Sequence, residues 1–261
     1  MPTASRFLEP RFIALAHRGG ARLPANLGIE NTITAFENAV KLGYRYLETD
    51  VHATKDGHVV AFHDTVLWRM TETPGKLADL TLAEIKRLRV GGRESIATFA
   101  ELLEAFPTAN FNVDLKADDV VAPFAAEIKR HGAQHRVCVG SFATARIRRF
   151  RKLLPEVATA VSTRGVAVLP TCCVPITRAR GDVFQVPMTA TVGGIPIRLV
   201  TPQIVKTVHR ANRKIHVWTI DNPEVMHELI DWGVDGIFTD RPDLLRDVLQ
   251  SRGMWSTRQG T

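Results

Sequence analysis

The sequence is poor in cysteine and contains no long hydrophobic run. Its 261 residues include three cysteines, of which Cys172 and Cys173 are adjacent and Cys138 stands alone. This odd count leaves no disulfide framework evident, and no Cys-x-x-C pair suggests a zinc site. No apolar run approaches the roughly 18 residues of a membrane span, and residues 1–11 lack the apolar core of a secretory signal. We therefore expect a cytoplasmic protein without a transmembrane segment.

A dinucleotide-binding motif and a nucleic-acid-binding motif are also missing. No Gly-x-Gly-x-x-Gly sequence follows the first expected strand. The excess of 34 Lys and Arg over 27 Asp and Glu gives a formal net charge of +7, which favours anionic partners. The basic residues are scattered, and the run at 146–152 has no stacking aromatic apart from Phe150. We expect no nucleic-acid partner, whereas a phosphorylated metabolite or peripheral contact with a lipid surface stays open.

Eight short apolar segments are predicted to be strands, and most precede a segment with helical spacing. They begin near residues 12, 45, 110, 136, 157, 183, 215 and 236. Asn31 or Thr32 can cap the first helix. Eight such units in about 250 residues favour a closed TIM-type (β/α)8 barrel, and a doubly wound open sheet is the alternative. The segment 165–180 is ambiguous, because Pro170 and Pro175 argue against one long helix.

One barrel domain across residues 1–261 would carry two additions. The roughly 45 residues between His63 and the next barrel strand are long for a connection. We interpret residues 64–108 as a short insertion after the second strand that covers the site. After Gln250 the sequence becomes polar, so residues 251–261 are predicted to form a loose tail. The oligomeric state and the purpose of the adjacent cysteines stay open.

The most informative stretch runs from residue 48 to residue 64. Glu48 and Asp50 lie two positions apart on an expected strand and therefore point to the same face. Two like carboxylates on one face repel unless a cation or a proton lies between them. Asp56-Gly57 indicates a tight turn, after which a second apolar run returns and brings His63 beside the carboxylates. A hairpin with a solvated edge is the alternative interpretation.

Polar residues also follow the first and third expected strands. His17 and Arg18 come directly after an apolar run, and Asp114 and Lys116 share one face of a later strand. In a parallel barrel the C-terminal ends of all strands meet at one mouth, where functional groups lie. We therefore expect these four residues to share one site with the carboxylates of the second strand.

The residue types at this mouth indicate phosphate-ester cleavage. Three carboxylates without a thiolate suit a hard divalent cation, Mg²⁺ or Ca²⁺. Arg18 and Lys116 supply fixed positive charge for a phosphate. His17 and His63 can titrate near neutral pH, so one can remove a proton from the attacking oxygen while the other protonates the leaving alcohol. A structural or surface role is the alternative for each imidazole alone.

From residue 14 to residue 249, the chain resembles the glycerophosphodiester phosphodiesterase family. The matching motifs are Ala16-His17-Arg18-Gly19, Glu30-Asn31-Thr32, Glu48-Thr49-Asp50-Val51, Thr54-Lys55-Asp56-Gly57, His63-Asp64, Val113-Asp114-Leu115-Lys116, Trp218-Thr219 and the segment 236–242. The resemblance implies a (β/α)8 barrel, a divalent metal, and hydrolysis of glycerophosphodiesters to sn-glycerol 3-phosphate and an alcohol. It also implies a cyclic phosphate, formed when the glycerol hydroxyl attacks phosphorus and then opened by water.

The resemblance assigns roles to eight residues. The acid–base pair would be His17 and His63. The metal ligands would be Glu48, Asp50 and Asp114, and the substrate-binding residues would be Arg18, Lys116 and Trp218, with Trp218 lining the glycerol pocket. The family usually has Glu where this chain has Asp114, and proline where it has Ile29. The first exchange makes the metal choice uncertain, because aspartate is one methylene shorter.

Other activities remain compatible with the sequence. A lyase of the phospholipase type would stop at the cyclic phosphate, and a lysophospholipase D would act on lysolipids. The insertion after His63 is short compared with that of some members of the family it resembles, which leaves room for a bulky leaving group. A catalytically silent phosphate-binding or lipid-binding barrel should have lost a histidine or a carboxylate, and only the exchange at Asp114 is of this kind.

Overall fold

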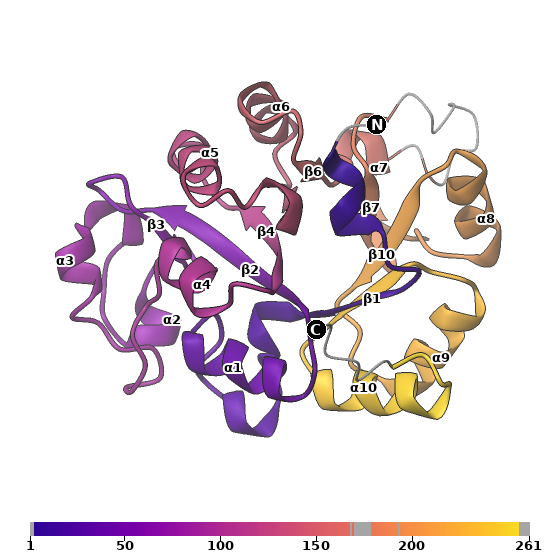
Figure 1. Ribbon diagram of the computed structural model, residues 1–261, viewed down its shortest axis with the longest axis horizontal. Coiled ribbons are helices and arrows are strands. Elements are labelled where there is room, and N and C mark those ends of the chain that lie inside the picture. The colour runs from indigo at the N-terminus through magenta and orange to yellow at the C-terminus, as the bar shows by residue number, and fades with distance from the viewer. Residues whose placement is uncertain (1–2, 168, 170–178, 193, 256–261) are drawn as a thin grey trace.

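Eight parallel strands form a nearly closed barrel in the computed structural model, which describes residues 3–167, 169, 179–192 and 194–255. Figure 1 shows the strands surrounded by helices. The strands are β1 (Ile13–Ala16), β2 (Tyr46–Ala53), β4 (Asn110–Leu115), β5 (Val137–Gly140), β6 (Ala158–Thr159), β7 (Val183–Pro187), β10 (Lys214–Trp218) and β11 (Gly236–Thr239). They are ordered β6-β5-β4-β2-β1-β11-β10-β7, and a parallel bridge between Ala160 and Val183 joins the two ends. The predicted barrel is confirmed.

Helices cover the outside of the barrel. They are α1 (Ile33–Lys41), α4 (Phe99–Ala105), α5 (Val121–Arg130), α6 (Thr144–Leu153), α8 (Pro202–Arg210), α9 (Pro223–Asp231) and α10 (Pro242–Ser251). The short helix α7 (Thr163–Val166) follows β6 and borders the cavity described below. The predicted cap is Thr32, whose side chain accepts from the backbone N–H of Ala35. Proline begins each of the last three helices, where its missing N–H costs no hydrogen bond.

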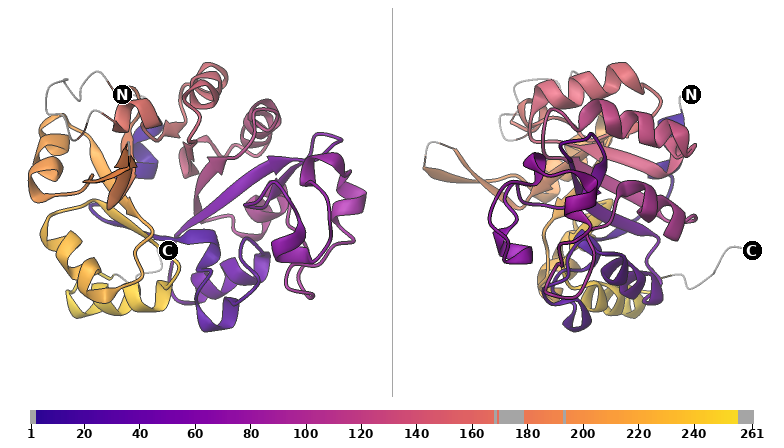
Figure 2. Two further views of the ribbon diagram at one scale, coloured as in Figure 1. Left: turned by 180° about the vertical axis from the view of Figure 1, so that it is seen from behind. Right: turned by 90° about the vertical axis from the view of Figure 1, so that its left-hand side faces the viewer.

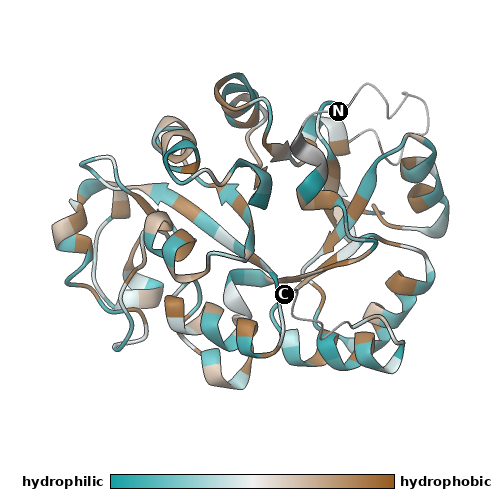
Figure 3. Cartoon of the chain, in the orientation of Figure 1, coloured by the Kyte–Doolittle hydropathy of each residue, from teal (hydrophilic) through white to brown (hydrophobic). Residues whose placement is uncertain are grey.

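Alternation along the strands separates an outer apolar layer from the barrel interior. On β2, Leu47 and Val51 belong to the same apolar cluster as the buried side chains of α1, whereas Glu48 and Asp50 face the other way and line the cavity described below. Figure 3 shows hydrophobic and hydrophilic residues alternating around the helices, as expected for helices with one buried side.

The end of the barrel opposite the site is closed by the N-terminal 3-10 helix η1 (Thr3–Leu8). Phe7 is fully buried there and packs with Cys138, Ala158 and Val183. Its carbonyl oxygen accepts a hydrogen bond from the Tyr46 hydroxyl at 3.0 Å, and the two rings meet edge to face. The interior is therefore apolar at this end and polar at the C-terminal ends of the strands.

The connection between β2 and β4 forms a small substructure outside the barrel. β3 (Val59–Ala61) pairs antiparallel with β2 and is followed by α2 (Trp68–Thr71), the 3-10 helix η4 (Leu77–Asp79) and α3 (Leu82–Ile85). Buried residues between 60 and 96 form an apolar cluster of their own. In contrast, α4 packs against the main core through Phe99, so the range 64–108 also contains the barrel helix of this unit.

Three segments add to or differ from the expectations. An unpredicted hairpin, β8 (Thr189–Val192) with β9 (Ile195–Arg198), follows β7 and projects from the body in the right-hand view of Figure 2. Within the expected loose tail, the described residues end at Trp255, whose ring packs on Tyr44 at 5.1 Å between centroids. The remainder of that tail lies outside the described residues. Pro170 and Pro175 of the ambiguous segment and the adjacent cysteines also lie outside the described residues.

None of the described helices is long and apolar enough to cross a membrane.

Candidate active site

One cavity of about 380 Å³ opens at the C-terminal ends of the barrel strands. It is lined by all eight residues that the sequence analysis singled out: His17, Arg18, Glu48, Asp50, His63, Asp114, Lys116 and Trp218. β1, β2, β4 and β10 contribute seven of them from the strands or the positions directly after them, and the turn after β3 contributes His63. The shared site expected from the barrel geometry is therefore present as a cavity.

A tight turn after β1 brings the first histidine into this cavity. The backbone of Arg18, Gly19 and Gly20 adopts positive φ values of 51°, 83° and 88°, a region that glycine tolerates best. A side chain on Gly19 would also lie 3.0 Å from the backbone of Ala35. The turn can therefore pass close to α1 and leave His17 at the mouth of the barrel.

His17 lies between two carboxylates. Its Nδ1 is 2.7 Å from Oδ1 of Asp240, which follows β11, and its Nε2 is 3.7 Å from Oε2 of Glu48. Because a carboxylate can only accept, Nδ1 carries the hydrogen in this contact. Burial lowers the pKa of His17, but the two carboxylates outweigh it and the pKa is raised.

The two carboxylates of β2 have opposite electrostatic environments. Burial raises the pKa of Glu48 to about 7, despite the opposing charge of His17. Burial would also raise the pKa of Asp50, but Lys116 and Arg18 outweigh it and the pKa is lowered. The Arg18 Nε lies 3.2 Å from Oδ2 of Asp50 as an ion pair without hydrogen-bond alignment. Asp50 is therefore the fixed negative charge of the pair.

Lys116 bridges the carboxylates of two neighbouring strands. Asp50 of β2 is paired in register with Asp114 of β4. The ammonium nitrogen of Lys116 is 2.8 Å from Oδ1 of Asp50 and 2.8 Å from Oδ2 of Asp114. Burial raises the pKa of Asp114 even with this ammonium beside it. The third carboxylate thus shares one cation with the second.

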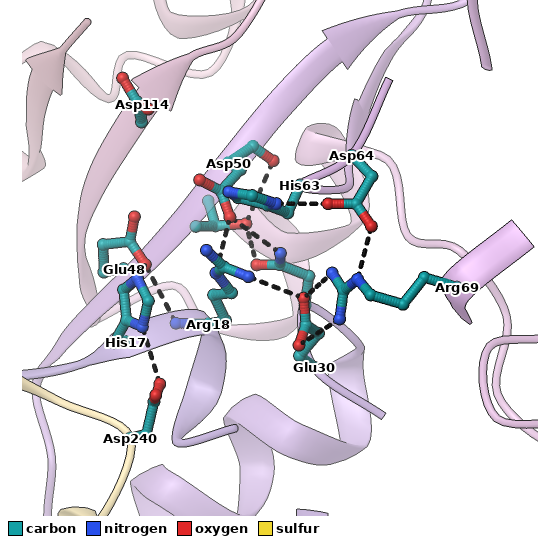
Figure 4. Close-up of polar contacts among 12 residues, drawn as sticks. His17, Arg18, Glu30, Glu48, Asp50, His63, Asp64, Arg69, Asp114 and Asp240 are labelled. Carbon is teal, nitrogen blue, oxygen red and sulfur yellow. Dashed lines mark hydrogen bonds and ion pairs between the residues drawn. The ribbon is translucent and has the colours of Figure 1, made fainter. Parts of the chain in front are cut away.

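The second histidine is positioned by the hairpin of β2 and β3. The backbone N–H of Phe62 donates to the carbonyl of Asp50 at 2.9 Å, and Nε2 of His52 lies 3.1 Å from the carbonyl oxygen of His63. His63 Nδ1 is 2.6 Å from Oδ1 of Asp64 (Figure 4). Both histidines therefore contact a carboxylate through the same ring nitrogen.

The opposite wall of the cavity is largely apolar. Trp218 and Phe142 meet edge to face with 5.8 Å between ring centroids, and Lys116 Nζ lies 5.9 Å from the Phe142 centroid. Other apolar lining residues are Val161, Val166, Pro187, Ala190 and Leu199. The cavity can accommodate a charged group on one side and an apolar group on the other.

The carboxylates of Glu48, Asp50 and Asp114 are ligands of the type that a hard divalent cation prefers. All three line one cavity from adjacent strands and offer only oxygen donors. Among the described residues, no three His, Cys, Asp or Glu side chains converge as a ready metal cage. Lys116 takes two of the oxygens as the side chains stand.

Several residues of this network were not singled out from the sequence. Asn31, considered only as a helix cap, donates from its amide to Oδ2 of Asp50 at 3.1 Å. Glu30, Asp64 and Asp240 lay within matching motifs but had no assigned role. Arg69 had no sequence signal, because it lies in a segment without clear periodicity.

Comparison with known proteins identifies close relatives. The family model described as the glycerophosphoryl diester phosphodiesterase family matches residues 17–244. A Mycobacterium tuberculosis protein named probable glycerophosphodiester phosphodiesterase 2 is 41% identical over 262 residues, which cover 97% of each chain. A glycerophosphodiester phosphodiesterase of Caldanaerobacter subterraneus is 31% identical, with 92% of this chain and 99% of that protein covered.

Solved structures share the fold. A crystal structure of a putative glycerophosphoryl diester phosphodiesterase from Silicibacter pomeroyi has a TM-score of 0.79 at 22% identity, with 99% of this chain and 100% of that chain covered. A phosphodiesterase from Oleispira antarctica, in complex with the product sn-glycerol-3-phosphate, has a TM-score of 0.75 at 22% identity, with 91% and 96% covered. At these identities the likeness shows the fold alone.

Proposed function

Because the chain belongs to the glycerophosphoryl diester phosphodiesterase family, and is thus an enzyme that acts on glycerophosphodiesters, we propose that it releases sn-glycerol 3-phosphate and an alcohol by histidine acid–base catalysis. The observation that carries this proposal is the convergence of His17 and His63 on one cavity with two cationic side chains. Each imidazole has a carboxylate at Nδ1, which leaves Nε2 for the substrate.

The proposed reaction has two steps. In the first, one histidine removes the proton of the glycerol hydroxyl, whose oxygen forms a bond to phosphorus. The bond from phosphorus to the leaving alcohol breaks, and the other histidine protonates that alcohol. In the second, water opens the resulting cyclic phosphate with the proton transfers reversed. One water is consumed overall, and the product is sn-glycerol 3-phosphate.

Arg18 and Lys116 would hold the phosphate in this reaction. A guanidinium matches two phosphate oxygens at once, whereas an ammonium acts as a point charge. Both already lie beside Asp50, so they are held at the mouth before substrate arrives. Trp218 lies on the cavity wall opposite the carboxylates and would contact the glycerol there.

We further propose that Glu48, Asp50 and Asp114 bind one divalent cation, Mg²⁺ or Ca²⁺. When bound, the cation would polarise a phosphoryl oxygen and neutralise the charge that develops on it. The support is the donor chemistry of the three carboxylates and the burial that raises the pKa of Glu48 to about 7. A cation would favour the ionised form of that carboxyl.

Product analysis tests the activity and the metal together. Glycerophosphocholine and glycerophosphoethanolamine would be incubated with enzyme treated with chelator, before and after Mg²⁺ or Ca²⁺ is added back. We expect sn-glycerol 3-phosphate only after metal addition. His17→Ala and His63→Ala should lose most of kcat while keeping the wild-type circular dichroism spectrum. Accumulation of a cyclic phosphate as the final product would support a lyase instead, and near-normal turnover of either variant would refute its assigned role.

A second candidate activity is that of a lysophospholipase D. The apolar wall formed by Phe142, Trp218 and their neighbours favours the acyl chain that a lysolipid carries on its glycerol. A human protein named lysophospholipase D is 25% identical over 288 residues, with 93% of this chain and 88% of that protein covered. Release of choline from lysophosphatidylcholine at a rate near that from glycerophosphocholine would support this activity.

We also propose a cytoplasmic location. The sequence leaves no disulfide framework evident, and Cys138 is a buried free thiol whose pKa burial raises well above its usual value. Such a thiol is inert and needs no oxidising environment. Cell fractionation with a marker of each compartment tests the location.

A further inference from the structure

The segment after β3 contributes one guanidinium to the polar network around the cavity. Arg69 lies in α2, and its Nε–H donates to Oδ2 of Asp64 at 2.5 Å. Its Nη1 and Nη2 atoms donate to Oε2 and Oε1 of Glu30 at 3.2 and 2.7 Å. Figure 4 shows the Arg69 side chain lying between these two carboxylates and contacting both. Arg69 is not among the residues that line the cavity.

Asp64, which accepts from Arg69, also contacts the second histidine. Burial would raise the pKa of Asp64, but hydrogen bonds from Arg69 and His63 outweigh it and the pKa is lowered. Asp64 is therefore ionised and accepts at both oxygens, one from each neighbour. The hydrogen of the neutral imidazole of His63 must then be on Nδ1, and Nε2 remains free to exchange a proton with substrate.

Glu30, which accepts from Arg69, also contacts Arg18. Its Oε1 accepts from Nη1 of Arg18 at 2.9 Å and from Nη2 of Arg69 at 2.7 Å. Burial would raise the pKa of Glu30, but the two arginines outweigh it and the pKa is lowered. Charge-assisted contacts of this kind are stronger and more directional than neutral hydrogen bonds. A continuous chain of them runs from Arg18 through Glu30, Arg69 and Asp64 to His63.

We propose that Arg69 is a positioning residue for the reaction, fixing the Asp64 carboxylate that orients His63 and tying it through Glu30 to the arginine that holds phosphate. This inference rests on the proposed function. Arg69 spans two carboxylates because its planar fork presents donors in two directions. Lysine offers one ammonium nitrogen, which cannot reproduce the three separate donor positions, Nε, Nη1 and Nη2, that Arg69 presents to Asp64 and Glu30. The insertion thus acts on catalysis through a side chain that lies outside the cavity.

Steady-state kinetics of Arg69→Gln tests this role. We expect kcat to fall by about tenfold to a hundredfold, part of the range that acid–base catalysis supplies, while KM changes by less than about threefold. Arg69→Lys should recover only part of kcat. Lys86→Gln is the matched control, because it breaks an ion pair with Glu101 in the same region and neither residue lines the cavity. We expect wild-type kcat for this control.

A double-mutant cycle shows whether Arg69 acts through Asp64. If it does, Arg69→Gln should lower kcat far less in the Asp64→Asn background than in the wild type. If the kcat losses of the two single variants simply multiply in the double variant, the inference is overturned. An unchanged kcat of Arg69→Gln with a lowered unfolding midpoint would also overturn it. Neither result would touch the proposed function, which the activity of the wild type would still support. A wild-type enzyme that releases no product from any glycerophosphodiester would overturn the proposed function and this inference with it.

Discussion

The Oδ1 atom of Asp240 lies 2.7 Å from Nδ1 of His17, although 223 positions separate the two residues in the sequence. The contact is possible because β1 and β11 are parallel neighbours, with Ala16 opposite Thr239. The residues that follow these partners therefore emerge side by side at the mouth. This pairing fixes which nitrogen of His17 faces the cavity.

Asp240→Asn should consequently impair catalysis without unfolding the barrel. An amide can donate to Nδ1, which would shift the ring hydrogen to Nε2 and leave the wrong tautomer facing the substrate. We expect kcat to fall by at least about tenfold, within the range of acid–base contributions, and the unfolding midpoint to change little. The ¹⁵N shifts of the His17 ring report the tautomer directly. Wild-type kcat combined with an altered tautomer would remove His17 from proton transfer.

Lys116→Gln should mainly weaken phosphate binding. The change removes the ammonium that lies 2.8 Å from both Asp50 and Asp114 and leaves those carboxylates to repel each other. We expect kcat/KM to fall by at least about tenfold, since a charge-assisted contact contributes more than a neutral one. Arg246→Gln, which removes a cation paired with Asp247 on α10, is the control. An unchanged kcat/KM for Lys116→Gln would exclude this lysine from the site.

Asp114→Asn should raise the metal concentration that gives half-maximal activity. An amide oxygen carries no charge and is a weaker ligand for a hard divalent cation than a carboxylate. We expect a shift of about tenfold or more, comparable to the loss caused by changing groups around a metal site. Asp114→Glu restores the charge with the longer side chain usual in the family and should recover most of the affinity. A wild-type metal dependence for Asp114→Asn would show that this carboxylate is not a ligand.

The strands of the barrel could be predicted because each contains a short apolar run, and several of them, among them β1, β2 and β4, have polar residues at or after their C-terminal ends. That pattern also located the cavity residues, since parallel strands bring their ends together. The β8–β9 hairpin could not be predicted in this way. The described side chains of β9 are half-buried or exposed, so it has no buried face to produce alternation.

Contacts between residues far apart in the chain could not be predicted from the sequence, for a different reason. Arg69 and Glu30 are 39 positions apart, and nothing in either segment specifies that their side chains meet. Trp255 follows a polar run, and nothing in that run specifies that its ring packs against Tyr44. Such pairings follow from the packing of elements and leave no local periodicity.

His216 should make the stability of the barrel depend on pH. The imidazole is fully buried on β10 beside Phe238, and neither ring nitrogen has a hydrogen-bond partner among the described residues. Burial, with a smaller contribution from Lys214, lowers the pKa of His216 from 6.5 to about 3. Between these values the unfolded chain binds more protons than the folded one at this residue. The free energy of unfolding should therefore rise with pH from about 3 to 6.5, and the contribution of His216 should be complete above 6.5.

A His216→Leu variant isolates this effect. One proton corresponds to a slope of at most about 1.4 kcal/mol per pH unit, so the difference in unfolding free energy between wild type and variant should change by about that amount per unit near pH 5. Above pH 7 the difference should be constant, because both states of the wild type then carry a neutral ring. Urea unfolding between pH 4.5 and pH 8, with chelator present throughout, measures both limbs. A difference that stays constant down to pH 4.5 would mean that His216 takes up its proton as readily in the folded barrel as in the unfolded chain.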